Sequence, residues 1–239
     1  MWRAFLHGVR QLAYPDLCLF CRDLHDNPDA DFCPKCLLDF TCDPETTCPR
    51  CASTVAPQAD VTGGCVRCRE FTFHFDSAVR MNAYKPPLSD AVIRMKRLPG
   101  DILAECLAKV WAENMAVKLR SLKPDVVVPI PLHWRRRLWR GFNGPAIFAQ
   151  ALATRLRVPC RPRLLRRTRA TPSQTTLTPA QRRDNVKNAF AARSWRGLAG
   201  KTVILIDDVL TTGSTTSEAA KALKAAGAKA VHVAVIAHR

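Results

Sequence analysis

Hydrophobic and polar positions follow different patterns before and after residue 75. In the later part, three short runs are almost wholly apolar: 125–130 (DVVVPI), 202–206 (TVILI) and 231–236 (VHVAVI). Apolar runs of strand length are typical of strands buried on both faces of a parallel sheet. Helical patterns accompany them at 101–121, 144–157 and 215–226. Strands and helices in this alternation predict an α/β fold with a doubly wound, mainly parallel sheet.

The first 75 residues are too few and too polar to bury a large core of their own. We therefore predict two modules, residues 1–75 and residues 76–239. The chain would begin with an amphipathic helix over residues 1–12, because Trp2, Phe5, Val9 and Leu12 fall on one helical face. We expect this face to dock on the protein's own core rather than on a membrane.

Charged residues or proline interrupt every apolar stretch before it reaches the ~18–20 residues of a membrane span. We therefore expect no spanning helix. Residues 1–12 are not followed by the continuous apolar segment or the small-residue cleavage site of a signal peptide. The chain is expected to be cytoplasmic.

Cysteine is concentrated near the start of the chain. Eight of the eleven cysteines form four Cys-x-x-Cys pairs: Cys18 and Cys21, Cys33 and Cys36, Cys48 and Cys51, Cys65 and Cys68. One such pair supplies two thiolates to a metal from a single tight turn, and a second pair completes a tetrahedral sulfur shell. The spacing predicts two structural zinc sites in a double zinc ribbon.

Two other interpretations of these cysteines stay open. Disulfides or a redox Cys-x-x-Cys fit less well, because we expect no oxidising compartment. Cross-braced pairing would instead join the first and third pairs on one ion. Pairing of neighbours closes shorter loops and so costs less chain entropy.

The net charge is +17, from 37 Lys and Arg against 20 Asp and Glu. Residues 1–75 are slightly acidic, so the excess lies in the second module, which favours a polyanionic partner. Residues 120–196 hold eighteen Lys and Arg against only Asp125 and Asp184. Aromatic residues interleave with this charge, as in surfaces that hold single-stranded nucleic acid. The candidate contacts are Arg135, Arg136, Arg137 and Arg140, near Trp134, Trp139, Phe142 and Trp195.

The run at 202–206 leads into two carboxylates and a loop rich in hydroxyl groups. Asp207 and Asp208 can accept hydrogen bonds from the hydroxyl groups of a ribose, and Gly213 allows a tight turn before a helix. Free backbone N–H groups at that helix start would face a phosphate. The loop residues are Thr211, Thr212, Gly213, Ser214 and Thr215. The alternative is a plain capped helix, in which Thr215 and Glu218 form a capping box.

This segment resembles the motif that binds 5-phosphoribosyl 1-pyrophosphate (PRPP) in type I phosphoribosyltransferases. Almost the whole chain resembles the ComF family, with its ComFC and GntX-type members. The resemblance rests on the double Cys-x-x-Cys module, Tyr84, Lys96, residues 128–133 (VPIPLH), Arg137, residues 140–143 (RGFN), Arg167, Thr168, Ser173, Gln174, Arg183, residues 185–186 (NV) and residues 189–190 (AF). One departure is Gly144-Pro145, where the family usually has Gln after Gly-Phe-Asn.

The resemblance implies that residues 76–239 form a phosphoribosyltransferase-like domain. It assigns Asp207 and Asp208 to the ribose as the catalytic pair, residues 211–215 to the 5-phosphate, and the turn Pro129-Ile130-Pro131 to pyrophosphate, with Mg²⁺ on the leaving group. The stretch 167–185 has little hydrophobic periodicity and would be a mobile lid. Its contacts with PRPP would be Thr171, Ser173, Gln174 and Arg183.

The family acts in competence and DNA use, which implies single-stranded DNA as a partner, together with a DNA-uptake or helicase protein. The chemistry stays open between two classes. A transferase would release pyrophosphate through an oxocarbenium-like transition state, whereas a PRPP-responsive module would bind nucleic acid without turnover. His133 and His232 are candidate bases by residue type alone, and the acceptor pocket has no sequence signature.

Overall fold

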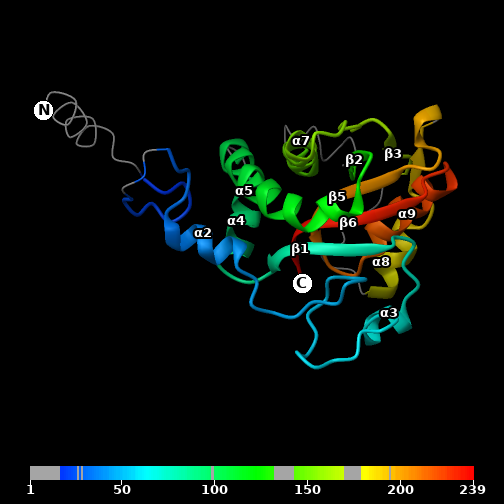
Figure 1. Ribbon diagram of the computed structural model, residues 1–239, viewed down its shortest axis with the longest axis horizontal. Coiled ribbons are helices and arrows are strands. Elements are labelled where there is room, and N and C mark those ends of the chain that lie inside the picture. The colour runs from blue at the N-terminus through cyan, green and yellow to red at the C-terminus, as the bar shows by residue number, and fades with distance from the viewer. Residues whose placement is uncertain are drawn as a thin grey trace, which may run out of the picture.

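A central parallel sheet positions the remaining elements. The computed structural model describes residues 17–25, 27, 29–97, 100–131, 143–169, 179–193 and 195–239, without the side chains of 179, 180, 182, 183 and 196. Within them the sheet has four strands in the order β1-β6-β5-β2, all parallel (Figure 1). The strands are β1 (Ser77–Ala83), β2 (Val126–Pro129), β5 (Thr202–Leu210) and β6 (Ala230–His238).

Helices cover both faces of this sheet. α5 (Asp101–Leu119) and α7 (Gly144–Leu156) lie on one face, and α9 (Ser214–Ala225) lies on the other (Figure 1). In β5, Ile204 and Ile206 pack toward α5 and α7, whereas Val203 and Leu205 pack toward α9. All four side chains are fully buried. The continuous apolar runs therefore come from strands with two buried faces, and the predicted doubly wound α/β fold is confirmed.

The predicted helices and strands lie close to their observed bounds. α5 is followed by the short 3₁₀ helix η1 (Arg120–Leu122). β5 continues past its apolar run to Leu210, so the acidic pair sits inside the strand and not after it. The residues expected to form an N-terminal helix, 1–12, lie outside the described part of the chain.

The stretch 167–185 is not wholly a loop. It starts in β3 (Leu165–Arg167), which pairs antiparallel with β4 (Phe190–Ala192), and it ends in α8 (Pro179–Val186). α8 packs against α9. Val186 is fully buried, and the Asn188 amide donates to the Glu218 carboxylate on α9 at 2.9 Å. A short 3₁₀ helix, η3 (Arg196–Leu198), precedes β5.

The cysteines lie in two copies of one small unit. In each, a tight turn carries the first cysteine pair, and a helix begins at the second pair: α2 (Pro34–Thr41) in the first unit, residues 18–36, and α3 (Val66–Glu70) in the second unit, residues 48–68. The turns match in detail, because Arg22 and Ala52 follow equivalent cysteines and have φ of 71° and 59°. The first unit rests beside α5, and α4 (Leu88–Arg94) donates to its backbone through Arg94.

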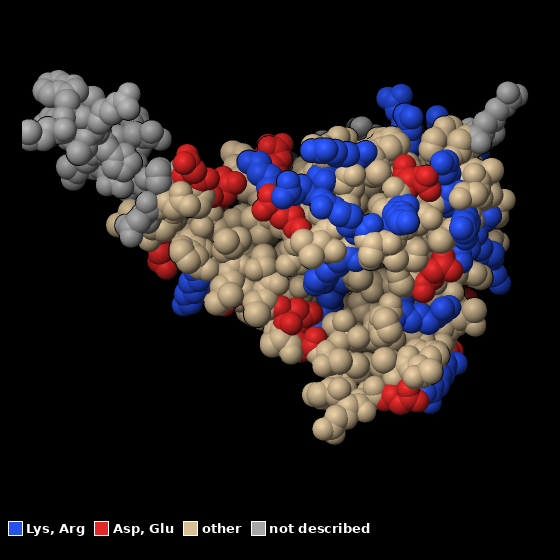
Figure 2. Space-filling model, viewed as in Figure 1, with Lys and Arg blue, Asp and Glu red and all other residues tan. Residues whose placement is uncertain are grey.

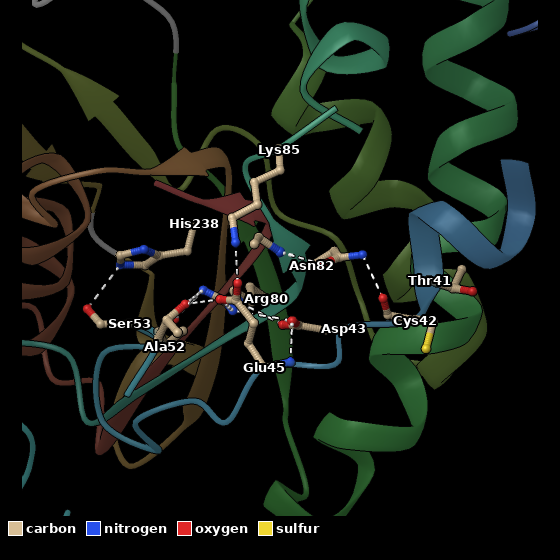
Figure 3. Close-up of polar contacts among 12 residues, drawn as sticks. Thr41, Cys42, Asp43, Glu45, Ala52, Ser53, Arg80, Asn82, Lys85 and His238 are labelled. Carbon is tan, nitrogen blue, oxygen red and sulfur yellow. Dashed lines mark hydrogen bonds and ion pairs between the residues drawn. The ribbon is translucent and has the colours of Figure 1, made fainter. Parts of the chain in front are cut away.

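Arg80 on β1 ties the connector between the units to the sheet. Its side chain is 2% exposed, and its Nε lies 2.8 Å from Asp43 and its Nη2 lies 3.0 Å from Glu45 (Figure 3). It also donates to the Ala52 carbonyl at 3.3 Å. This anchor thus holds the connector that joins the two units, and the division of the chain at residue 75 stays a prediction.

None of the helices in the described ranges combines the length and the hydropathy that crossing a bilayer takes.

Candidate functional site

The eight paired cysteines form two clusters of four. Cys18, Cys21, Cys33 and Cys36 make one, and Cys48, Cys51, Cys65 and Cys68 make the other, with all Sγ atoms of a cluster within 4.8 Å. The pairing is therefore sequential, as loop entropy favours, and not cross-braced.

The geometry of both clusters suits a tetrahedral metal. Zn–S bonds of about 2.3 Å place sulfur atoms about 3.8 Å apart in a tetrahedron. The Sγ atoms of Cys21 and Cys33 are 3.7 Å apart, and those of Cys48 and Cys68 are 3.9 Å apart. All eleven cysteines are described and none is in a disulfide.

Burial and crowding make each cluster unstable as four free thiolates. Burial, and then the neighbouring thiols, raise the pKa of Cys36 and of Cys68. A cation removes this penalty, because it stabilises all four thiolates at once. The remaining cysteines, Cys42, Cys106 and Cys160, lie outside both clusters.

A second group of polar side chains lies at the carboxyl edge of the sheet. Asp207 and Asp208 are on β5, and the Asp208 carboxylate forms an ion pair with Lys96 at 2.6 Å. Burial, and then the charge of Asp208, raise the pKa of Asp207 well above its usual range. The pair therefore holds a carboxyl group that a cation or a polyhydroxyl ligand would help to ionise.

The loop after β5 leads directly into α9. Gly213 is the N-cap of α9 at φ +76°, and the Thr212 and Ser214 hydroxyl groups lie 2.9 Å apart. The capping-box alternative does not describe this helix start, because the cap residue has no side chain and Glu218 accepts a bond from Asn188 instead. The backbone amides of the first turn can therefore face an anion.

The turn Pro129-Ile130-Pro131 lies beside the strand that carries the acidic pair. Pro129 at the end of β2 pairs with Ile206, and the Ile130 amide donates to the Ile206 carbonyl at 2.8 Å. Ile206 immediately precedes the acidic pair. The sheet thus brings together the residues expected to bind ribose, phosphate and pyrophosphate.

Other predicted site residues are elsewhere. His232 pairs with Ile204 on β5, four residues before Asp208, which is about 13 Å along a strand. It bonds to Ser77 at 2.7 Å, at the opposite edge of the sheet. His133, Arg135, Arg136, Arg137, Arg140, Thr171, Ser173 and Gln174 lie outside the described residues, as does the side chain of Arg183 in α8.

Cations gather around β3, β4 and the segments that flank them. The exposed side chains are Arg161, Arg163, Arg166, Arg169, Lys187 and Arg193. The Arg161 guanidinium lies 5.5 Å from the centre of the Trp195 ring. Figure 2 shows that Lys and Arg outnumber acidic side chains where β3 and α9 lie on this face.

The second unit reaches the loop expected to bind phosphate (the phosphate loop, residues 211–215), a contact that the sequence did not predict. Arg67, between Cys65 and Cys68, donates to the Thr211 carbonyl. A cavity of about 720 Å³ lies between the two, with Arg67, Phe71 and Thr212 among its lining. The one sequence signal is that both Cys-x-x-Cys loops of this unit carry arginine before their last cysteine, and those of the first unit do not.

The chain is similar to several known proteins. Residues 142–239 match the phosphoribosyl transferase domain family. The DNA utilization protein YhgH of Escherichia coli (strain K12) is 33% identical over 93% of this chain and 96% of its own length. Competence protein F of Haemophilus influenzae is 31% identical over 90% of this chain and 94% of its own. The solved glutamine PRPP amidotransferase from B. subtilis is 25% identical over 56% of this chain and 26% of that chain, with a TM-score of 0.37.

Proposed function

The chain belongs to the family of the DNA utilization protein YhgH and Competence protein F, and on that premise we propose that it binds PRPP with Mg²⁺ and acts with single-stranded DNA. The observation that supports this most is the meeting, at one sheet edge, of Asp207 and Asp208 with residues 129–131 and 211–215. PRPP carries groups that suit each of these parts.

Each part has a separate role. Asp207 and Asp208 accept hydrogen bonds from the ribose hydroxyl groups. The loop residues Thr211 to Thr215 and the first amides of α9 bind the 5-phosphate, and the backbone of residues 129–131 binds pyrophosphate. Magnesium prefers oxygen ligands, so the acidic pair and the pyrophosphate suit it, and it would neutralise the leaving group.

Two zinc ions complete the proposed cofactor set. The two sulfur clusters have the separations of zinc thiolate sites and no other ligand type. Four thiolates per ion make both sites closed, so their role is structural.

The reaction class would be transfer of the phosphoribosyl group. The bond from ribose C1 to the pyrophosphate oxygen breaks, a bond from C1 to an acceptor forms, and pyrophosphate leaves. Binding without turnover is the second candidate, because no base is identified among the described residues: His232 lies at the opposite edge of the sheet from the acidic pair, and His133 lies outside those residues.

Single-stranded DNA is the polyanion that the cationic surface around β3 and β4 would hold. Among the described side chains of these segments, six cations are exposed but only one acid, Asp184. Replacing Arg161, Arg163 and Arg166 with Ala should weaken binding of a short oligonucleotide and flatten the dependence of its affinity on salt. An unchanged salt slope would locate the DNA contact elsewhere, with Arg135, Arg136, Arg137 and Arg140 as the next variants.

The decisive experiment is titration calorimetry of the zinc-loaded protein with PRPP and Mg²⁺, with and without the oligonucleotide, while released pyrophosphate is assayed. The double variant Asp207→Asn, Asp208→Asn should lose PRPP binding, and exposed Asp90→Asn is the matched control. The double variant should stay folded, because it relieves the burial of Asp207, whose pKa is raised, while it loses the partly exposed ion pair between Asp208 and Lys96. Wild-type affinity in the double variant would overturn the ribose assignment.

The pyrophosphate assay in the same titration measures turnover. Pyrophosphate release would indicate a PRPP-consuming activity. Binding without release, together with a changed DNA affinity, would favour the PRPP-responsive module.

A further inference from the structure

The second unit holds the phosphate loop by its backbone. The Arg67 Nη2 group donates to the Thr211 carbonyl, and its Nη1 group lies 3.3 Å from His238 Nε2 and 3.4 Å from Ser53 Oγ. Ser53 and His238 also face each other, at 3.3 Å (Figure 3). Arg67 is thus fixed on both sides, between its own unit and the end of β6.

Holding this carbonyl sets the direction of the next amide. The Thr211 carbonyl and the Thr212 N–H belong to one trans peptide, so they point in opposite directions. With the carbonyl turned toward the second unit, the Thr212 N–H turns away from it. The charged guanidinium also polarises the peptide, which strengthens the hydrogen bond that this N–H can donate.

A second arginine of the same unit supports the other side of the loop. Arg50, between Cys48 and Cys51, donates to the Phe73 carbonyl at 3.2 Å. The Phe73 ring lies against Gly213, so closely that a Cβ on this glycine would be 2.7 Å from Phe73 Cε1. Both Cys-x-x-Cys loops of the second unit therefore contact the phosphate loop or the residue that buttresses it.

The first unit has no such contact among the described residues. Its corresponding positions are Phe20 and Lys35. Phe20 packs on Phe40 with ring centres 5.3 Å apart, inside the unit's own core. The two units thus differ at the positions that reach outward.

We propose that Arg67 is a positioning residue for the phosphate loop, and that metal in the second cluster sets the loop's affinity for a ribose phosphate by ordering the segment that carries Arg67. Metal in the first cluster has no such effect. The ligand named here rests on the proposed function, whereas the ordering of the loop does not.

The test uses Arg67→Leu and Arg67→Lys, with Arg69→Leu as the control, because Arg69 is exposed on the same short helix. Calorimetry measures the affinity for PRPP with Mg²⁺ and for ribose 5-phosphate alone. Arg67→Leu should lower both affinities about tenfold, the size expected for one charge-assisted hydrogen bond. Arg67→Lys should recover part of the loss, since an ammonium group can also donate to a carbonyl, and Arg69→Leu should bind as the unaltered protein does.

A second measurement decides the case without any ligand. Hydrogen exchange of the amides in residues 211–215 should be faster in Arg67→Leu than in Arg69→Leu, with two zinc ions retained in both. Unchanged exchange and unchanged affinity would overturn the positioning role. If no variant and not even the unaltered protein binds PRPP, the proposed function fails, and the exchange data alone decide whether Arg67 orders the loop.

Discussion

The two cysteine units share one backbone design and differ in what they touch. Each joins a tight turn to the start of a helix, with matching residues at positive φ. The first rests on α4, where Arg94 donates to the Phe20 carbonyl at 2.6 Å. The second reaches the loop before α9 through Arg67. The same four-cysteine unit therefore packs on a helix in one place and contacts the loop before α9 in the other.

The difference comes from the residues between the cysteines. An aromatic side chain at Phe20 turns inward, onto Phe40. Arginine at positions 50 and 67 turns outward, because its guanidinium needs acceptors and finds backbone carbonyls. The four cysteines are common to both units, and the residues between them determine which neighbour each unit contacts.

The largest expected effect is a loss of stability that concerns both units equally. Arg80→Leu leaves Asp43 and Glu45 without their buried partner, so the free energy of unfolding should fall by about 3–5 kcal/mol. Denaturant unfolding measures the loss, and both clusters should release metal to a chelator faster. Arg94→Leu, which touches the first unit only, should cost about 1 kcal/mol. Faster release from one cluster alone in Arg80→Leu would contradict a shared anchor.

The next effect separates the units. Cys21→Ser and Cys68→Ser remove matched, half-buried ligands, one from each cluster. Cys68→Ser should weaken PRPP binding by up to about a hundredfold, because it frees the segments of both Arg67 and Arg50. Cys21→Ser should leave that affinity within about twofold. Calorimetry beside metal analysis measures this, and equal losses in the two variants would mean that neither unit acts on the loop specifically.

A glycine pair tests the contact with Phe73. Gly213 and Gly63 both have positive φ, at +76° and +80°, but a Cβ meets Phe73 only at Gly213. Gly63→Ala should cost about 1 kcal/mol for its backbone alone. Gly213→Ala should cost about 2–3 kcal/mol and also weaken ligand binding, because overpacking adds to the strain. Thermal unfolding of the two variants decides, and equal costs would mean that Phe73 moves aside freely.

The smallest effect depends on pH and concerns the connector. Hydrogen bonds from Lys85, Thr54 and Arg80 lower the pKa of Glu45 to about 2. An acid whose pKa is lower in the folded state stabilises the fold above its unfolded pKa and loses that contribution as pH falls through the folded value. Stability should therefore decline between about pH 4.5 and pH 2. Glu45→Gln should flatten this decline by less than about 1 kcal/mol, since the carboxylate is partly exposed. A pH series of unfolding curves in which the variant declines as steeply as the unaltered protein would contradict this role.

The sheet could be predicted where its strands carry their own signal. β5 and β6 each contain a mainly apolar run, and two buried faces explain these runs. β1 carries Arg80 and Asn82, so its pattern does not indicate a strand. Asp43, Glu45 and the Cys42 carbonyl satisfy these side chains, and they lie far away along the chain. No local pattern reveals such a partner.

The same limit applies to the candidate site. The acidic pair and the loop could be identified from sequence because one segment holds both. The cysteine clusters could be identified because their members lie close in sequence. Arg67 meets Thr211 across 144 positions of sequence. From sequence alone, a charged residue beside a paired cysteine is expected to be exposed to solvent. Only the fold shows that Arg67 has an acceptor. The middle of the predicted lid, residues 170–178, and the predicted arginine contacts lie outside the described residues, and the roles of both stay predictions.

Sequential pairing of the cysteines also bears on the order of events at the ribosome. Cys21 and Cys33 are 12 residues apart, and Cys51 and Cys65 are 14 apart, so each unit can bind its metal once a short segment has left the exit tunnel. β1 can pair with β6 only after β6 has been synthesised, because His232 on β6 follows its partner Ser77 on β1 by 155 residues. During that wait, Arg80 already has Asp43 and Glu45 as partners. The connector between the cysteine units can therefore hold β1 by its Arg80 side chain while the rest of the sheet is being synthesised.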